Sequence, residues 1–293
     1  NESELMDCII KLCNEFDKVE PLSITNTMED DYFNDLDNND DPYLIFQSLN
    51  AKGDKLQQSD LCKNYIFMKI REKNQKYLDV NDVNKEQLDI YNNYWKPLEE
   101  IFNSPSNISN SKVMNMDMFL QNYLRITTTD KIQGTKIYLN LTKEFDNFDY
   151  EASINKIKEI HKYGQLFHMI EDPERSALCR EDPKLKLLLK RLKDFDTSSI
   201  RPLIVKLYIL FYENKTDSFY NCLSVIESYI ARQKIINMSN TTLNRFILIY
   251  LPKLKGNEES PDEFLKSIFL KTESETDKWP DDEQVIDAFK KLT

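Results

Sequence analysis

The chain has 293 residues, a length that one large domain or two ordinary domains can fill. Hydrophobic residues make up 40% of it and aromatic residues 11%, which is enough for a large core and excludes wholesale disorder. Only 4 glycines occur, which disfavours β-barrels, Rossmann domains and P-loops, since all of these depend on glycine-rich turns. Because the net charge is −11, any contact with nucleic acid must come from a local basic surface.

The N-terminal part is predicted to combine helices with one short strand. Apolar residues recur at helical spacing over residues 3–16, and residues 19–24 form the one convincing strand pattern, where Pro21 indicates an edge position. An acidic loop over residues 28–41 follows. Pro42 then suits the first turn of a short helix, Gly53 interrupts the chain, and residues 60–70 are again helical.

Nearly every later segment has the apolar period of a helix. Ser198 or Ser199 is expected to cap a helix that has Pro202 in its first turn and ends at residue 212. The other helices are expected over residues 91–102, 113–126, 154–170, 185–192, 219–238, 243–251, 264–270 and 283–292. The predicted fold class is therefore mainly α, a helical bundle or array with a small α+β element at the N-terminus.

No metal site is predicted. The cysteines are odd in number and scattered without a CxxC pair, which favours reduced thiols in the core: Cys8, Cys13, Cys62, Cys179 and Cys222. His161 and His168 are seven residues apart rather than four, so core or interhelical roles are favoured over metal binding. The acidic loop lacks the glycine and the terminal glutamate of an EF-hand, and a solvated loop is favoured.

A cytoplasmic location without a membrane partner is expected. Glu2, Glu4 and Asp7 are incompatible with the basic start of a signal peptide. The most apolar stretch, residues 203–212, is interrupted by Lys206 and is too short to cross a bilayer.

The segment over residues 41–70 reads DPYLIFQSLNAKGDKLQQSDLCKNYIFMKI and is predicted to form helix, tight turn, helix. Asn50 ends the first helix and Gly53 supplies the backbone freedom for the reversal. Gln57 is a weak N-cap for the second helix, and Asp60 has a favourable place in its first turn. Asn64 shares an apolar stripe with neighbouring residues, so its amide is expected to be half-buried and hydrogen-bonded. Such polar groups build a site, and they also brace a turn.

This string resembles the Phe-x-x-Leu-Asn-x-x-Gly-x-x-Leu-x-x-x-Asp-Leu-x-x-Asn segment of the GmrSD-type restriction proteins, bacterial defence proteins that cleave modified phage DNA in a nucleotide-dependent manner. The runs YWKPLEEIF, FLQNYLR and LSVIESYIARQKIINMSNTTLNRFI are similar as well and follow in the same order. A complete member has an N-terminal domain with a DGQQR motif, a helical middle and an HNH-like nuclease. This chain has neither the DGQQR nor the HNH pattern.

The resemblance therefore implies two parts: residues 1–80 close the ParB-like nucleotide-binding domain, and residues 81–293 are the all-helical middle domain. It implies that Asn50, Gly53, Asp60 and Asn64 contribute to a nucleotide pocket, and that the intact protein uses a nucleoside triphosphate with Mg²⁺. No catalytic residue is assigned, and the chain alone is expected to be inactive. The expected partners are nucleotide and DNA; whether the chain forms a homo-oligomer is left open. The family usually has Ser or Thr where Gln57 stands.

Two basic segments are candidate DNA contacts. Lys186, Lys190 and Arg191 could form a basic helix face, or they could be solvated and compensate the acids at 181, 182, 194 and 196. Arg232, Lys234 and Arg245 flank a helix–turn–helix-like junction, which packing explains equally well. The alternative function is accordingly a non-catalytic helical module that binds or regulates a protein or DNA partner.

Overall fold

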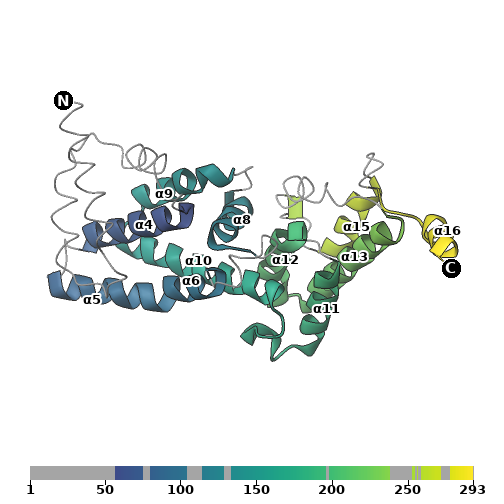
Figure 1. Ribbon diagram of the computed structural model, residues 1–293, viewed down its shortest axis with the longest axis horizontal. Helices are drawn as coiled ribbons and strands as arrows, with labels where there is room; N and C mark the ends of the chain where they lie inside the picture. The colour runs from purple at the N-terminus through teal and green to yellow at the C-terminus, as the bar shows by residue number, and fades with distance from the viewer. Residues whose placement is uncertain are drawn as a thin grey trace. The chain divides into compact units, whose positions relative to one another are not determined.

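The computed structural model describes residues 57–74, 80–103, 114–128, 133–195, 198–237, 253–254, 256, 259–271 and 278–292 (Figure 1). Every regular element in these ranges is helical, so the protein is mainly α-helical, as predicted. The predicted strand at residues 19–24, the earlier helices and the helix over residues 243–251 lie outside the described residues. The described residues belong to one compact unit, Gln57–Thr293, whereas the predicted domain boundary lies between residues 80 and 81.

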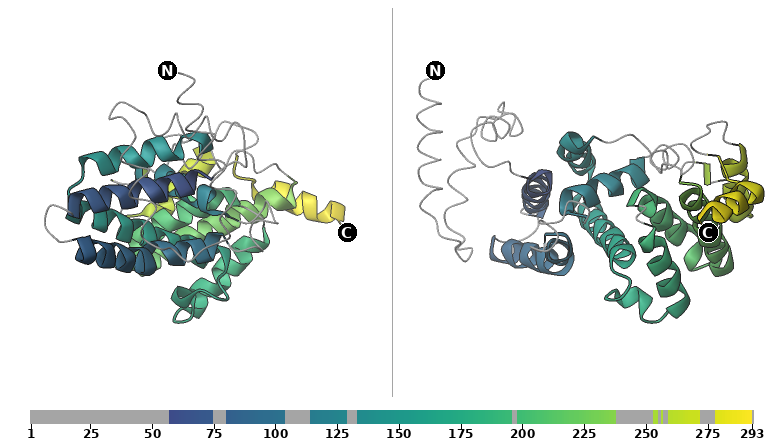
Figure 2. Two further views of the ribbon diagram at one scale, coloured as in Figure 1. Left: turned by 60° about the vertical axis from the view of Figure 1, so that its left-hand side comes forward. Right: turned by 45° about the vertical axis from the view of Figure 1, so that its right-hand side comes forward.

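The first helix group packs around its longest member, α10 (Tyr150–Glu171). Its other members are α4 (Gln58–Asn74), α5 (Val80–Ile90), the π-helical segment η1 (Tyr91–Trp95), α6 (Lys96–Phe102), α8 (Met116–Thr128), the short 3₁₀ segment η2 (Gly134–Lys136) and α9 (Ile137–Asn147). The segments α5, η1 and α6 follow one another without a break. Helix α4 packs along α9, and α10 contacts α4, α6 and α8 (Figure 2).

The second helix group follows in the chain. It consists of η3 (Ala177–Cys179), α11 (Pro183–Asp194), η4 (Ser198–Ile200), α12 (Arg201–Leu207), the π-helical segment η5 (Tyr208–Tyr212), α13 (Thr216–Ile235), α15 (Pro261–Lys271) and α16 (Asp282–Leu292). Helix α12 contacts α8 and α10 of the first group and α13 of its own group, so it joins the two. Helices α5 and α9 were not predicted, although Ile137, Leu141 and Phe145 give α9 a clear apolar face.

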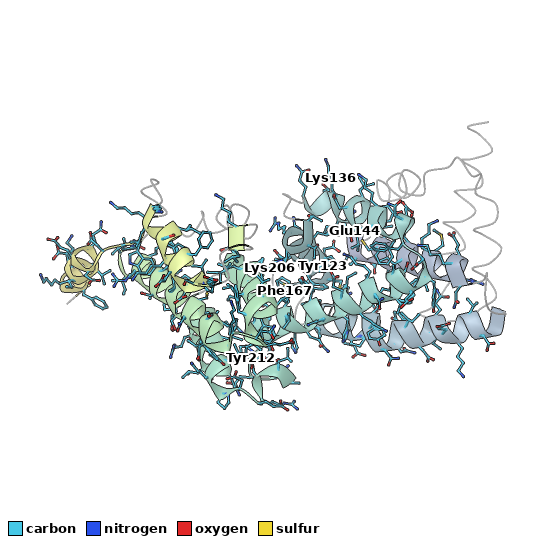
Figure 3. All side chains as sticks on the ribbon, turned by 180° about the vertical axis from the view of Figure 1, so that it is seen from behind. Tyr123, Lys136, Glu144, Phe167, Lys206 and Tyr212 are labelled. Atoms are coloured by element: carbon cyan, nitrogen blue, oxygen red, sulfur yellow. The ribbon has the colours of Figure 1, made fainter. Side chains whose placement is uncertain are left out.

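Aromatic side chains fill the centre of the first helix group. Phe119 is fully buried; its ring stacks on Phe102 with centroids 4.7 Å apart and meets the edge of Phe167 at 5.8 Å. In Figure 3, Tyr123 and Phe167 lie among these helices. Gly164 of α10 faces Leu98 so closely that a β-carbon at this position would collide with the leucine side chain. The absence of a side chain at Gly164 therefore permits the close approach of α10 and α6.

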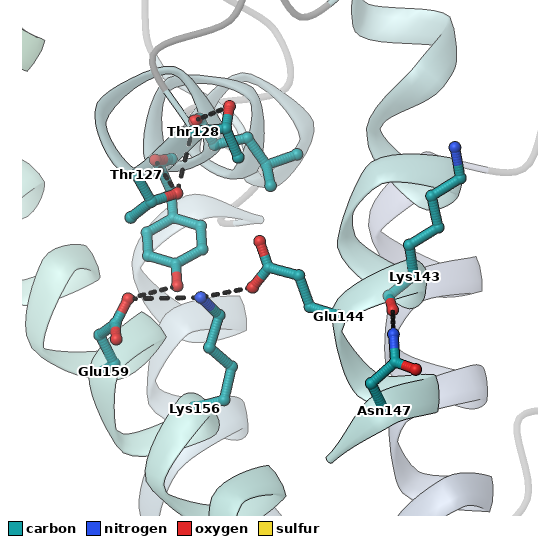
Figure 4. A network of polar contacts seen from close by, with 9 residues as sticks. Thr127, Thr128, Lys143, Glu144, Asn147, Lys156 and Glu159 are labelled. Atoms are coloured by element: carbon teal, nitrogen blue, oxygen red, sulfur yellow. Dashed lines mark hydrogen bonds and ion pairs between the residues drawn. The ribbon is translucent and has the colours of Figure 1, made fainter. Parts of the chain in front are cut away.

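A polar network joins α8, α9 and α10 at the edge of this core (Figure 4). Lys156 has only 12% of its side chain exposed, and its Nζ lies 2.6 Å from Glu144 Oε2 and 3.6 Å from Glu159 Oε1. The hydroxyl of the buried Tyr123 donates a hydrogen bond of 2.6 Å to Glu159, while the Lys156 ammonium lies 5.3 Å from the Tyr123 ring centroid. Each polar group in this network thus has a partner on another helix, as burial requires.

Carboxylates start several of the helices. Asp149 and Asp182 accept backbone hydrogen bonds of 2.7 and 2.9 Å in the first turns of α10 and α11. Asp281 and Gln284 bond reciprocally to each other's backbone at the start of α16. A 3₁₀ turn over Ser198–Ile200 precedes α12, so the residue that flanks the α-helix is Ile200, which makes no side-chain cap, and Pro202 lies in the first turn as expected.

Asp182 also connects α11 with η5 and α13. Its Oδ2 accepts a hydrogen bond of 2.7 Å from the Tyr212 hydroxyl and a second, shorter one from Tyr220. Although burial acts in the opposite direction, the hydrogen bonds from Tyr220, the Leu185 amide and Tyr212 lower the pKa of Asp182. These contacts give the carboxylate a structural role.

Two further sequence expectations can be compared with the described residues. Cys62, Cys179 and Cys222 are free, buried thiols, as predicted, while Cys8 and Cys13 lie outside the described residues. Burial raises the pKa of the Cys179 thiol to about 11. No helix in the described ranges combines the length and the apolar character that crossing a bilayer requires.

Candidate functional site

The second half of the Asn50–Asn64 motif lies on helix α4. Asp60 is in its first turn and Asn64 is one turn further along, so both side chains leave the same side of the helix. Asn50 and Gly53 lie outside the described residues. The buried residues of α4 are Ser59, Cys62, Ile66, Phe67, Ile70 and Asn74. Phe67 follows Asn64 by three positions, so the buried face borders the side that carries the motif residues.

Asn64 is exposed, and the expectation of a half-buried amide is wrong. Its stripe neighbours Leu61, Tyr65 and Met68 are partly exposed as well. The reason is that α4 carries two apolar stripes, and the stripe of Cys62 and Ile66 is the one that is buried. Asn64 is therefore accessible for contact with a ligand.

The start of α4 is capped by a carboxylate from another helix. Asp117 of α8 accepts hydrogen bonds from the backbone amides of Gln58 and Ser59, at 3.1 and 2.8 Å. Asp117 thus takes the capping role that the sequence assigned to Gln57, and its negative charge lies at the positive end of the helix dipole. The two amides that could otherwise bind a phosphate group are already hydrogen-bonded.

Helix α4 is also tied to η1 and α6 through Glu99. One oxygen of this carboxylate accepts hydrogen bonds from Lys63 Nζ at 3.0 Å and from the indole N–H of Trp95 at 3.2 Å. The other oxygen accepts a hydrogen bond of 2.8 Å from the Tyr91 hydroxyl. Burial and the bond to Glu99 raise the pKa of Tyr91 to about 12. Together with the Asp117 cap, these bonds hold α4 in one position.

Asp60 lies within this charged surrounding. Burial raises the pKa of its carboxyl group; Lys63 opposes that change, and the carboxylates of Glu99 and Asp117 add to it. Asp60 thus lies near two other carboxylates and one ammonium group. This arrangement favours a cation or a hydrogen-bond donor beside Asp60 over a bare phosphate.

Replacing the cap should weaken the fold modestly. We expect Asp117→Ala to lower the free energy of unfolding by about 1 kcal/mol, because two backbone amides lose their acceptor. Urea unfolding followed by circular dichroism measures the change. The matched control is Asp287→Ala on the exposed side of α16, where no change beyond about 0.5 kcal/mol is expected. Equal effects at both positions would contradict the capping role.

The first basic segment is paired with acids that are distant in the sequence. Lys186 and Lys190 both contact Glu174, and their hydrogen bonds lower the pKa of Glu174 to about 2. Arg191 binds Glu227 with two nitrogens, at 2.5 and 2.8 Å. These partners differ from the sequence neighbours that were expected to compensate the charges. A role in DNA binding stays a prediction for all three.

The second basic segment is described in part. Arg232 Nη2 lies 2.6 Å from Asp282 Oδ1, and Nη1 donates a hydrogen bond of 3.0 Å to the Pro280 carbonyl. The guanidinium also lies 5.7 Å from the centroid of the Trp279 ring. Lys234 is exposed at the end of α13, and Arg245 lies outside the described residues. Arg232 therefore fastens α16 to α13, and a DNA contact by these residues stays a prediction.

The histidines have the roles that their spacing favours. His161 bonds the Tyr94 carbonyl through Nδ1 at 2.8 Å and Gln165 through Nε2 at 2.9 Å, which joins α10 to η1. His168 is half-buried, and burial lowers its pKa. Within the described ranges no group of three or more His, Cys, Asp or Glu side chains could hold a metal ion. The acidic loop over residues 28–41 lies outside them.

Local sequence patterns did not indicate Asp117 or Glu99. Both lie in segments predicted to be helical, but neither has a neighbour in the sequence that marks it as a partner of α4. Comparison with known proteins adds no family assignment: the chain matches no protein-family model, and no curated protein or solved structure gave a significant match.

Proposed function

We propose that this chain is part of a phage-defence restriction enzyme of the GmrSD type, in which nucleotide hydrolysis is coupled to the cleavage of modified DNA. The observation that carries the proposal is the motif string over residues 42–68, with Asn50, Gly53, Asp60 and Asn64 in the family order. In this proposal the enzyme acts in the cytoplasm on a nucleoside triphosphate with Mg²⁺.

The position of α4 supports this proposal. Asn64 is exposed and Asp60 is partly exposed one turn before it, where a nucleotide could be reached, and Asp117 and Glu99 hold the helix from outside the motif. A binding wall of this kind needs side chains that are fixed before the ligand arrives, because their ordering then costs no binding energy.

The proposed division of labour follows from the contacts. Since the amides of Gln58 and Ser59 bind Asp117, the triphosphate must be bound by groups outside α4. Asn64 would offer its amide to the nucleotide, and Asp60 would accept a hydrogen bond or face the bound Mg²⁺. The bond-breaking groups for hydrolysis and for DNA cleavage would come from the DGQQR and HNH parts of the intact protein, and this chain alone would be inactive.

The proposal is tested by Asn64→Ala in the intact protein. We expect nucleotide hydrolysis to fall by about tenfold or more, which corresponds to a lost hydrogen bond to the ligand. The melting temperature should hardly move, because Asn64 is exposed. Glu72→Ala, an exposed position on the same helix, is the matched control and should keep full activity. Unchanged hydrolysis in Asn64→Ala would remove the nucleotide role of this side chain.

The second candidate is a non-catalytic helical module for a protein partner. It is favoured by α16, whose Ile286 and Phe289 are 51% and 53% exposed, and by the pairing of Lys186, Lys190 and Arg191 with acids. Sequencing the gene on both sides of the chain separates the candidates. DGQQR and HNH segments would support the enzyme, and a reading frame that ends at residues 1 and 293 would support the module.

A further inference from the structure

A cavity of about 510 Å³ opens between α5–η1 and the first half of α10. Its apolar part consists of Ile90 and Ile154, and two aromatic side chains, Tyr94 and Tyr150, also line it. The volume is within the range of cavities that bind small molecules or a single long side chain. It lies apart from the motif residues of α4, since none of them lines it.

The charged groups of this cavity are predominantly acidic. Glu86 and Asp89 come from α5 and Glu151 from α10, against the single ammonium of Lys158. Glu86 is held by a hydrogen bond of 2.8 Å from the Asn74 amide. Among the described residues none of the three carboxylates is in an ion pair, so the cavity keeps an excess of negative charge. Electrostatic attraction therefore selects a cation.

Lys158 shows how an ammonium group can lie against an aromatic side chain of this cavity. Its Nζ lies 5.8 Å from the centroid of the Tyr94 ring, within the distance of a cation–π contact. The cavity thus already holds one alkylammonium group of the protein against an aromatic face.

We propose that this cavity binds a small organic cation with alkylammonium groups, whose methylene chain packs on Ile90 and Ile154 while its ammonium groups contact Glu86, Asp89 and the tyrosine rings. Two sources share this chemistry, a free polyamine and the lysine side chain of a protein segment. The proposal does not depend on nucleotide hydrolysis or DNA cleavage.

Isothermal titration calorimetry on the full chain tests the proposal with two probes, spermidine and the peptide acetyl-Lys-Gly-Lys-amide. The double variant Glu86→Gln/Asp89→Asn should weaken binding by about tenfold or more, because two facing charges are lost. The control is Glu213→Gln/Asp217→Asn, which removes the same charge at exposed positions elsewhere and should leave binding unchanged.

Tyr94→Leu keeps the net charge and removes the aromatic face, so it should weaken binding by about two- to fivefold. The single variant Asp89→Asn, at an exposed position, keeps the test valid if Glu86→Gln or Tyr94→Leu lowers the melting temperature. Asp89→Asn should still weaken binding severalfold.

The outcomes are distinct. Tight binding of spermidine alone identifies a polyamine site, and binding of the peptide with weaker binding of spermidine identifies a site for a lysine side chain. The proposal is overturned if neither probe binds below about 1 mM. It is overturned equally if both double variants weaken binding to the same extent, since the attraction would then come from the net charge of the whole chain.

Discussion

Phe119→Ala is expected to lower the free energy of unfolding by about 3–5 kcal/mol. The ring is fully buried, stacks on Phe102 and meets the edges of other rings, so its removal leaves a cavity that neighbouring helices cannot close without moving. Urea unfolding, followed by the far-ultraviolet circular dichroism of the helices, measures the loss of free energy of unfolding.

Phe289→Ala is the matched control for this prediction. The same substitution is made in α16, where the ring is 53% exposed, and a change within about 0.5 kcal/mol is expected. A loss at Phe119 no larger than the loss at Phe289 would mean that Phe119 does not lie at the centre of the core.

Arg201→Met is expected to cost about 3–5 kcal/mol at neutral pH. Arg201 Nε lies 2.6 Å from Glu171 Oε1, and only 15% and 14% of the two side chains are exposed. Without the guanidinium, the carboxylate at the end of α10 stays buried and loses its closest positive partner. Arg175→Met is the control, since Arg175 is 85% exposed beside Asp172 and its loss should cost less than about 1 kcal/mol.

The pH dependence distinguishes this explanation from a simple loss of packing. Burial raises the pKa of Glu171, although Arg201 and Lys193 oppose it, and removing Arg201 should raise the pKa further. A carboxyl group with a raised pKa destabilises the fold in its charged form, so lowering the pH through that pKa restores stability. The deficit of Arg201→Met relative to the wild type should therefore shrink between about pH 7 and about pH 4.5. A deficit that is independent of pH would indicate lost packing alone.

Adding Glu171→Gln to Arg201→Met gives an independent check. Because glutamine carries no charge, the double variant should recover a large part of the stability lost at neutral pH. If the double variant is as unstable as the single one, the uncompensated charge of Glu171 is not the cause.

The sequence predicted most helices of the described region but not all of them. Helix α10 was expected over residues 154–170 and extends over Tyr150–Glu171, since Asp149 adds a cap ahead of the apolar pattern. Helix α5 was missed because its sequence is mostly polar and only Val83 and Ile90 among its described side chains are buried. With so few apolar residues, the segment has the composition of a polar loop, although their spacing is helical.

The candidate site was predicted in part. The motif placed Asp60 in the first turn of a helix, and that placement is confirmed. The burial of Asn64 was predicted wrongly, because the stripe with Leu61 and the stripe with Cys62 and Ile66 have the same period. The helices that pack on α4, namely α9, α5, α10 and α8, decide which stripe is buried.

The mainly helical class, the burial of the three described thiols and the place of α4 follow from the sequence alone, because each depends on local apolar spacing and on composition. Which charged side chains pair with one another depends on how the helices pack. Asp117 caps α4 from 58 residues away, and Arg191 pairs with Glu227 at a separation of 36 residues. Such pairs form where helices distant in the chain pack together, and no periodic pattern within one helix contains that information.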